Sequence, residues 1–297
     1  MDDNVKAAPL FCGVGTALVT PFSGGRVDIP AARRLAKRQR DAGISALIVA
    51  GTTGESPTLS ADERALLLSA VLDEVGGRIP VIMGTGANDT RTAVRYTEQA
   101  ARLGADGALV VTPYYNKGTA EGIVQHYFSV ADATELPMIL YNVPSRTGVD
   151  LTPPVLSRLA EHPRIVAIKE ASGKIDRVAD IRAALGDRLP IYCGNDGDLL
   201  PTLSLGGIGI ISVLSNLLPE ACISLWQSFT AGRVREAGEL AVALTPLCRL
   251  LFAETNPAPI KCAMADRGLC TDELRLPMTA VAPALRASLA AEVARFL

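Results

Sequence analysis

Short apolar stretches alternate with longer amphipathic ones over the first two thirds of the chain. The short stretches are rich in branched aliphatic residues, as in Ala46–Gly51 (ALIVAG) and Ile165–Ile168 (IVAI). Continuous apolar runs of this kind are typical of strands that are buried on both faces. Predicted strands cover residues 14–22, 46–51, 80–84, 108–113, 137–141, 165–169, 189–193 and 207–213. Predicted helices cover residues 28–42, a segment after Ser60, residues 89–103 and 119–133, a short segment from 152, and residues 174–185.

The helix boundaries carry clear signals. Ser60 followed by Glu63 is the pattern of a capping box, and Gly104 is expected to end the helix that Asp89 opens. The alternation gives about eight strand–helix units of near-equal length, which predicts an α/β fold, a (β/α)8 TIM barrel. A doubly wound sheet is the alternative, but Gly13-Val14-Gly15-Thr16 lacks the third glycine of a dinucleotide turn and leads into a strand.

The alternation stops after about Pro219, and the rest of the chain has only helical patterns. We expect these helices to be broken at Pro246, Pro257 and Pro259, and again around Pro277. The sequence therefore predicts a catalytic barrel over residues 1–219 and a C-terminal helical appendage over residues 220–297.

Composition narrows the class of protein. Hydrophobic residues make up 48% and charged residues 20% of the 297 residues, enough for a large buried core. A net charge of −2 without a basic cluster argues against nucleic acid or an anionic membrane as partner. No apolar run approaches the length of about 18 residues that a membrane span needs, and Met1-Asp2-Asp3-Asn4 is unlike the start of a signal peptide.

The cysteines and histidines give no sign of a metal or a cofactor. The six cysteines form no CxxC pair, so we expect buried, reduced thiols in a cytoplasmic protein. The two histidines, His126 and His162, lack a second ligand three or four residues away.

Polar clusters follow the predicted strands, at the ends where barrel enzymes hold their active sites. They are GTTGE (51–55), TPYYN (112–116), YNVPSRTG (141–148), KE (169–170) and GND (194–196). Each cluster alone could be turn or rim-packing chemistry. Because all of them meet at one face of one barrel, together they predict a single active site.

Lys169 is the central candidate, because it stands where the buried strand 165–169 leaves the core. Desolvation disfavours an ammonium there, and a neutral amine is a nucleophile for carbonyl carbon. A lysine at a strand end can instead simply extend its head to water. The neighbouring clusters favour an imine-forming lysine, whereas Glu170 faces the other side of the strand and is expected to be structural.

The other candidates suit the chemistry of an imine. The carbinolamine must lose water, which requires a proton donor beside the lysine. Tyr141 is expected to give this proton, with Thr53 and Tyr115 as relay. Arg146 offers a planar fork for a carboxylate, and backbone N–H groups near Thr52 and Thr53 could hold a second one. A keto acid is therefore the expected imine partner, together with a second substrate that carries a carboxylate.

These motifs, with NPAPIK (256–261) and LRLPMT (274–279) in the tail, resemble the dihydrodipicolinate synthase/N-acetylneuraminate lyase family of class I aldolases. The resemblance covers about residues 14–277 and is strongest to the synthase branch. It implies the condensation of pyruvate, held as a lysine imine, with L-aspartate 4-semialdehyde, the entry step of lysine biosynthesis by the diaminopimelate route.

The resemblance also implies a role for each matching residue. Lys169 would form the imine, Tyr141, Thr53 and Tyr115 would relay protons, Arg146 would hold the carboxylate of the semialdehyde, and Thr52, Thr53 and Gly194 would surround the pyruvate with the backbone of Ile211 nearby. A homotetramer built as a dimer of dimers is implied as well, with Tyr115 reaching into the neighbouring subunit's site.

Two alternatives to this function stay open. One is another pyruvate-dependent aldolase or dehydratase that acts on a sugar acid. Sialic-acid lyases of the family tend to have serine where Thr52 stands, and they lack an arginine matching Arg146. The other is a homologue that only binds a keto acid, against which the intact set of relay residues argues.

Feedback inhibition by L-lysine is expected to be weak or absent. Family members that lysine inhibits carry charged groups at the positions matching Ala61, Arg64 and Thr92. Two of these three side chains are uncharged here and give little for pairing with an amino acid.

Overall fold

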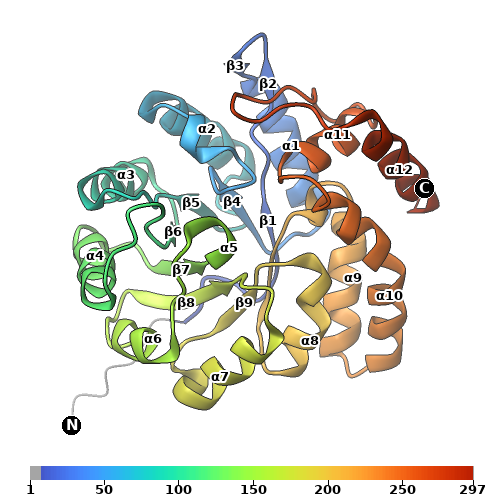
Figure 1. The fold of residues 1–297 in the computed structure, drawn as a ribbon. Coiled ribbons are helices and arrows are strands. Elements are labelled where there is room, and N and C mark those ends of the chain that lie inside the picture. The colour runs from blue at the N-terminus through green and yellow to red at the C-terminus, as the bar shows by residue number, and fades with distance from the viewer. Residues whose placement is uncertain (1–7, 297) are drawn as a thin grey trace.

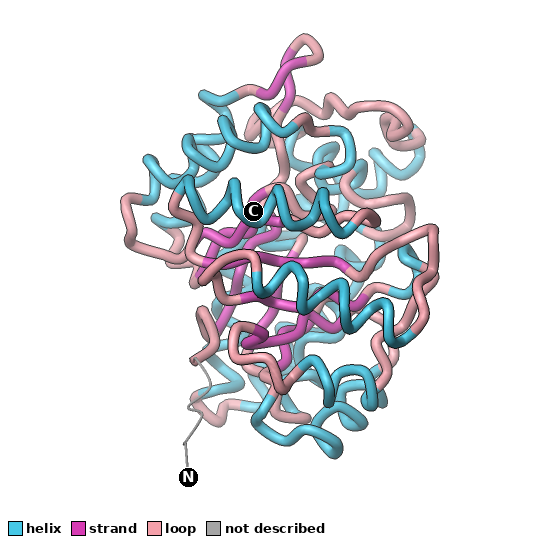
Figure 2. Tube along the Cα trace, turned by 90° about the vertical axis from the view of Figure 1, so that its left-hand side faces the viewer, coloured by secondary structure: helices cyan, strands magenta, loops and turns pink. Residues whose placement is uncertain are grey.

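The computed structural model describes residues 8–296, and its centre is a closed barrel of eight parallel strands in the spatial order β1-β10-β9-β8-β7-β6-β5-β4 (Figure 1). The strands are β1 (Gly13–Ala17), β4 (Ala46–Val49), β5 (Val81–Gly84), β6 (Gly107–Val111), β7 (Met138–Asn142), β8 (Ile165–Glu170), β9 (Ile191–Cys193) and β10 (Gly209–Ser212). In the side view the strands run through the middle of the molecule and helices lie outside them (Figure 2). The predicted (β/α)8 barrel is confirmed.

Helices follow the strands and form the outer ring of the barrel (Figure 1). They are α1 (Ile29–Asp41), α2 (Ala61–Val75), α3 (Thr90–Leu103), α4 (Ala120–Asp132), α6 (Pro153–Leu159), α7 (Ile175–Leu185), α8 (Leu199–Ser204) and α9 (Pro219–Thr230), with the short α5 (Pro144–Thr147) directly after β7. The capping box at α2 is confirmed: Ser60 Oγ accepts from the Glu63 N–H at 3.2 Å, and the Glu63 carboxylate accepts from the Ser60 N–H at 3.0 Å.

The first strand is shorter than predicted. β1 ends at Ala17, whereas the apolar pattern continues to Phe22. Pro21 has no N–H to donate to a neighbouring strand, and Gly24 and Gly25, with φ of 56° and 80°, turn the chain back on itself. Two short strands, β2 (Phe22–Ser23) and β3 (Arg26–Val27), therefore form a separate hairpin that projects beyond the barrel (Figure 2).

The C-terminal helices differ from the prediction at two prolines, one of which, Pro259, is the second residue of a helix, where proline is tolerated. They are α10 (Val234–Leu251), α11 (Ala258–Ala265) and α12 (Pro283–Val293), and Pro246 lies inside α10. The expected break at Pro246 was wrong. Leu244, Leu247 and Leu251 are almost fully buried on both sides of this proline, and burial of such side chains offsets the cost of a helix-interior proline, about 3 kcal/mol.

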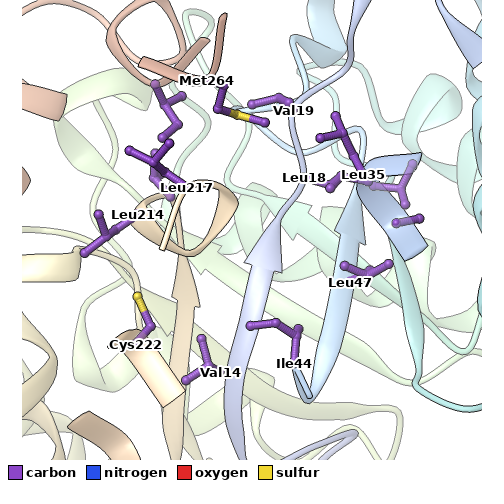
Figure 3. Packing of buried hydrophobic residues seen from close by; sticks show 14 of the residues in the cluster. Val14, Leu18, Val19, Leu35, Ile44, Leu47, Leu214, Leu217, Cys222 and Met264 are labelled. Atoms are coloured by element: carbon purple, nitrogen blue, oxygen red, sulfur yellow. The ribbon is translucent and has the colours of Figure 1, made fainter. Parts of the chain in front are cut away.

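A single hydrophobic cluster joins the barrel to the C-terminal helices. It runs from Val14 of β1 to Met264 of α11, which lies against Val19 just after β1 (Figure 3). Leu247 of α10 and Leu289 of α12 belong to the same cluster. The division of the chain at residue 219 stays a prediction.

Two smaller expectations concern the cysteines and the membrane. All six cysteines are free, but Cys12 is exposed and Cys270 is only half-buried, so the expectation of buried thiols was wrong at these two positions. Within residues 8–296 no helix has the length and apolar character to cross a membrane. The N-terminal residues Met1–Asn4, on which the expectation of no signal peptide depends, lie outside the described residues.

Candidate active site

Strands β7 and β8 bring Tyr141 and Lys169 together. The two residues are partners in the register of this strand pair, and both are buried, with exposed fractions of 6% and 4%. The Lys169 Nζ lies 4.2 Å from the centroid of the Tyr141 ring. The apolar run before Lys169 forms strand β8. Because Lys169 lies near the end of this strand, its amine lies beside the phenol ring of Tyr141.

These two side chains line a cavity of about 500 Å³ at the C-terminal ends of the strands. Its walls are Thr52, Thr53, Tyr141, Val143, Ser145, Arg146, Lys169, Ala171, Gly194, Asn195, Val213, Phe252, Ala253, Glu254, Thr255 and Asn256. Six of the eight candidate residues meet here. The other two do not line the cavity: Tyr115 is 88% exposed, and Ile211 is fully buried, with Val213 forming the wall two residues later.

Gly194 follows β9 and lies too close to the end of β8 for a larger residue. A Cβ on Gly194 would lie 2.5 Å from the Cβ of Ala171 and 2.8 Å from the Glu170 carbonyl oxygen. The Gly194 N–H donates to that same carbonyl at 2.7 Å, which holds the end of β9 close to β8. Glycine therefore lets the backbone after β9 lie directly against the end of β8 at the cavity wall.

Asn256 connects two of the candidate groups. Its Nδ2 donates to Thr53 Oγ1 at 3.0 Å, and its backbone carbonyl accepts from Arg146 Nη2 at 3.1 Å. No pattern in the sequence predicts a role for Asn256, although the family motif NPAPIK begins with it. Because Asn256 is more than 200 positions from Thr53 in the chain, only the fold shows that the two side chains meet.

A buried ion pair fixes the loop that carries the two threonines. Lys261 Nζ donates to Glu55 Oε1 at 2.8 Å and to the Thr20 carbonyl at 3.0 Å, and it also contacts the Glu273 carbonyl. The side chains of Lys261 and Glu55 are 0% and 2% exposed. Glu55 adopts a φ of 54°, which is uncommon for a residue other than glycine, so the pair holds a strained turn next to Thr53.

Glu170 has the structural role that its strand position suggests. Its carboxylate accepts from Asn142 Nδ2 at 2.9 Å and from the Ser172 N–H at 2.6 Å, and it does not line the cavity. Burial raises the pKa of Glu170, and these hydrogen bonds oppose that rise.

Asp196 of the GND cluster supports the part of the cavity wall that Val213 forms. Its carboxylate accepts from the Val213 N–H at 3.0 Å and the Leu214 N–H at 3.1 Å, and it also contacts the Ser212 hydroxyl. Burial raises the pKa of Asp196, whereas these donors lower it. The acid thus holds the backbone at Val213, where the chain borders the cavity.

A model of the dihydrodipicolinate synthetase family matches residues 10–295. A relative from Geotalea daltonii, 4-hydroxy-tetrahydrodipicolinate synthase, is 45% identical over 275 residues, which cover 93% of this chain and 95% of the relative. The chain belongs to the dihydrodipicolinate synthetase family.

Solved structures of the family agree with this assignment. Dihydrodipicolinate synthase from Thermotoga maritima superposes with a TM-score of 0.94 at 42% identity, over 97% of this chain and 99% of that one. The chloride-inhibited enzyme of Acinetobacter baumannii, solved in complex with pyruvate, gives a TM-score of 0.93 at 40% identity, over 96% and 98%. The family and the lyase class predicted from the sequence are confirmed.

Proposed function

We propose that the chain acts as a 4-hydroxy-tetrahydrodipicolinate synthase, which condenses pyruvate with L-aspartate 4-semialdehyde. One observation carries this proposal: the buried Lys169 amine lies against Tyr141 in a cavity that also contains Arg146 and Thr53. The set combines an imine-forming amine, a proton donor and a carboxylate partner. The Geotalea relative, which carries the same name, supports it.

In the first half of the reaction the Lys169 amine attacks the keto carbon of pyruvate. The carbinolamine then loses water to give the imine, and Tyr141, whose ring lies beside the amine, supplies the proton that the departing hydroxide takes. Removal of a methyl proton from this imine gives an enamine. Its carbon attacks the aldehyde of the second substrate, and attack of that substrate's amine on the imine carbon closes the ring and frees Lys169.

Thr53 is oriented for a proton relay by its contact with Asn256. The amide N–H of Asn256 donates to Thr53 Oγ1, which occupies an acceptor position of the hydroxyl. The hydrogen of the hydroxyl is then left to be donated elsewhere. This supports a role for Thr53 between Tyr141 and a further hydroxyl.

Tyr115 is the further hydroxyl that the relay requires, and in this chain it does not line the cavity. It is 88% exposed and has a φ of 75°, an uncommon conformation for a tyrosine. We therefore propose that the enzyme is a homotetramer, a dimer of dimers, in which Tyr115 of one subunit completes the relay of its neighbour. The free cysteines support a cytoplasmic location for this assembly.

The test is a coupled assay. Pyruvate and L-aspartate 4-semialdehyde are supplied with added dihydrodipicolinate reductase, and nicotinamide oxidation is followed. Rapid turnover is the expected result. Absence of turnover, with a sugar acid cleaved or dehydrated instead, would contradict the synthase assignment and favour the alternative branch of pyruvate-dependent lyases.

A further inference from the structure

The loop between α10 and α11 forms one side of the cavity. Five of its six residues, 252–256, line the cavity that Lys169 also lines. The loop belongs to the C-terminal helices, so the barrel and these helices together shape the part of the cavity that a second substrate enters.

Glu254 is the only acidic side chain among the residues that line this cavity. The other charged lining groups are Lys169 and Arg146, which are both cationic. Glu254 is half-buried, and its Oε1 accepts from the Ala282 N–H at 3.0 Å. Within residues 8–296 its second oxygen, Oε2, makes no hydrogen bond. The carboxylate therefore has an acceptor to spare at the cavity wall.

Asn256 presents a second acceptor without a donor. The residue is only 5% exposed. Its Oδ1 is buried and accepts no hydrogen bond from any group within residues 8–296. Its Nδ2 donates to Thr53, and its backbone carbonyl accepts from Arg146. A buried carbonyl oxygen that lacks a donor costs free energy, so a ligand with a donor would stabilise this site.

A free ammonium matches the chemistry of these two acceptors. It carries three donors and a positive charge, and it is bound best by a carboxylate together with a neutral oxygen. An α-amino acid holds its ammonium and carboxylate on one carbon, so the groups that recognise them must be neighbours. Arg146 and Asn256 are such neighbours, because they are joined by a hydrogen bond of 3.1 Å.

We propose that Glu254 and the Oδ1 of Asn256 bind the ammonium of the second substrate while Arg146 binds its carboxylate. The pair would select an aldehyde that carries an α-amino group over an otherwise equal aldehyde without one. This inference rests on the proposed function and assigns the recognition of the amine to the C-terminal loop.

The variant Glu254→Gln separates this role from a structural one. Glutamine keeps an oxygen that can accept from the Ala282 N–H, so the start of α12 stays bonded, but the negative charge is lost. The matched control is Glu239→Gln on the exposed side of α10, where the carboxylate contacts only Arg235 at 3.1 Å.

Two aldehydes give the readout. For Glu254→Gln we expect kcat/KM for L-aspartate 4-semialdehyde to fall by about tenfold, the effect of one charge-assisted hydrogen bond. The inhibition constant of succinate semialdehyde, which lacks the amine, should stay within about twofold, as should the KM for pyruvate and the borohydride trapping of its imine. Glu239→Gln should change none of these quantities.

An equal loss for both aldehydes, or no loss for the amino aldehyde, would overturn the inference while leaving the synthase function intact. If the native enzyme itself fails to condense L-aspartate 4-semialdehyde, the proposed function falls, and this inference falls with it.

Discussion

Replacement of Lys261 by methionine should destabilise the enzyme far more than removal of a surface charge. Lys261 is fully buried, and its ammonium donates to Glu55 and to two backbone carbonyls. Methionine retains an apolar stem of similar length but loses the ammonium, which also lies 4.4 Å from the centroid of the Phe22 ring. The substitution therefore removes the charge and its donors but little of the packing.

The size of the loss in stability depends on the Glu55 carboxylate, which stays buried without its ion-pair partner. Removing one partner of a buried ion pair costs about 3–5 kcal/mol, because the other charge stays buried without compensation. Here Glu55 keeps one donor, the Arg275 N–H at 3.1 Å from Oε2. We therefore expect a loss near the lower limit, about 3 kcal/mol in the free energy of unfolding, or about 6 °C in Tm.

Denaturant titrations of a double-mutant cycle measure this effect. The cycle comprises Lys261→Met, Glu55→Gln and the double variant, which should recover part of the loss because it leaves no buried charge. Lys37→Met is the control, since Lys37 pairs with Asp41 at 2.5 Å on the surface and should cost less than about 1 kcal/mol. If Lys261→Met is no more destabilised than Lys37→Met, the buried pair does not hold the turn at Glu55.

Three further predictions concern the relay, the regulation and one histidine. Tyr115→Phe should slow turnover by about 100-fold if the phenol relays protons; an unchanged rate in the coupled assay would reduce Tyr115 to a packing role. L-Lysine should not reach half-inhibition below about 1 mM, an affinity of roughly 4 kcal/mol, because Ala61 and Thr92 are uncharged and Arg64 already donates to the Gly84 and Ser56 carbonyls; inhibition at lower concentration would contradict this. Burial lowers the pKa of His126 from 6.5 to about 4, so stability should fall as the pH drops from about 6.5 towards 4, where the unfolded chain binds the proton and the folded chain does not; NMR titration of His126 near 6.5 would contradict it.

The sequence predicts the barrel well because local patterns decide its elements. Continuous apolar runs such as the one before Lys169 can be buried only in a central strand, and capping residues such as Ser60 mark where helices begin. The first strand and Pro246 are the exceptions. In both, the outcome depends on packing and turn geometry that the hydrophobic pattern does not contain.

The candidate site is predictable in part for the same reason. Tyr141 and Lys169 lie at the ends of neighbouring strands, so their meeting follows from the fold class alone. Glu254 and Asn256 come from the loop between α10 and α11, and Lys261 comes from α11, far along the chain from the barrel strands. No periodicity could place the first two at the cavity or Lys261 against Glu55, and only the three-dimensional structure shows their contacts.

The most direct test of the central claim is chemical trapping at Lys169. The enzyme is incubated with pyruvate, reduced with borohydride, digested and mapped by mass spectrometry. We expect the reduced pyruvate adduct on the peptide that contains Lys169, and no adduct when pyruvate is omitted. An adduct on another lysine, such as the buried Lys261, or no adduct at all, would contradict imine catalysis by Lys169.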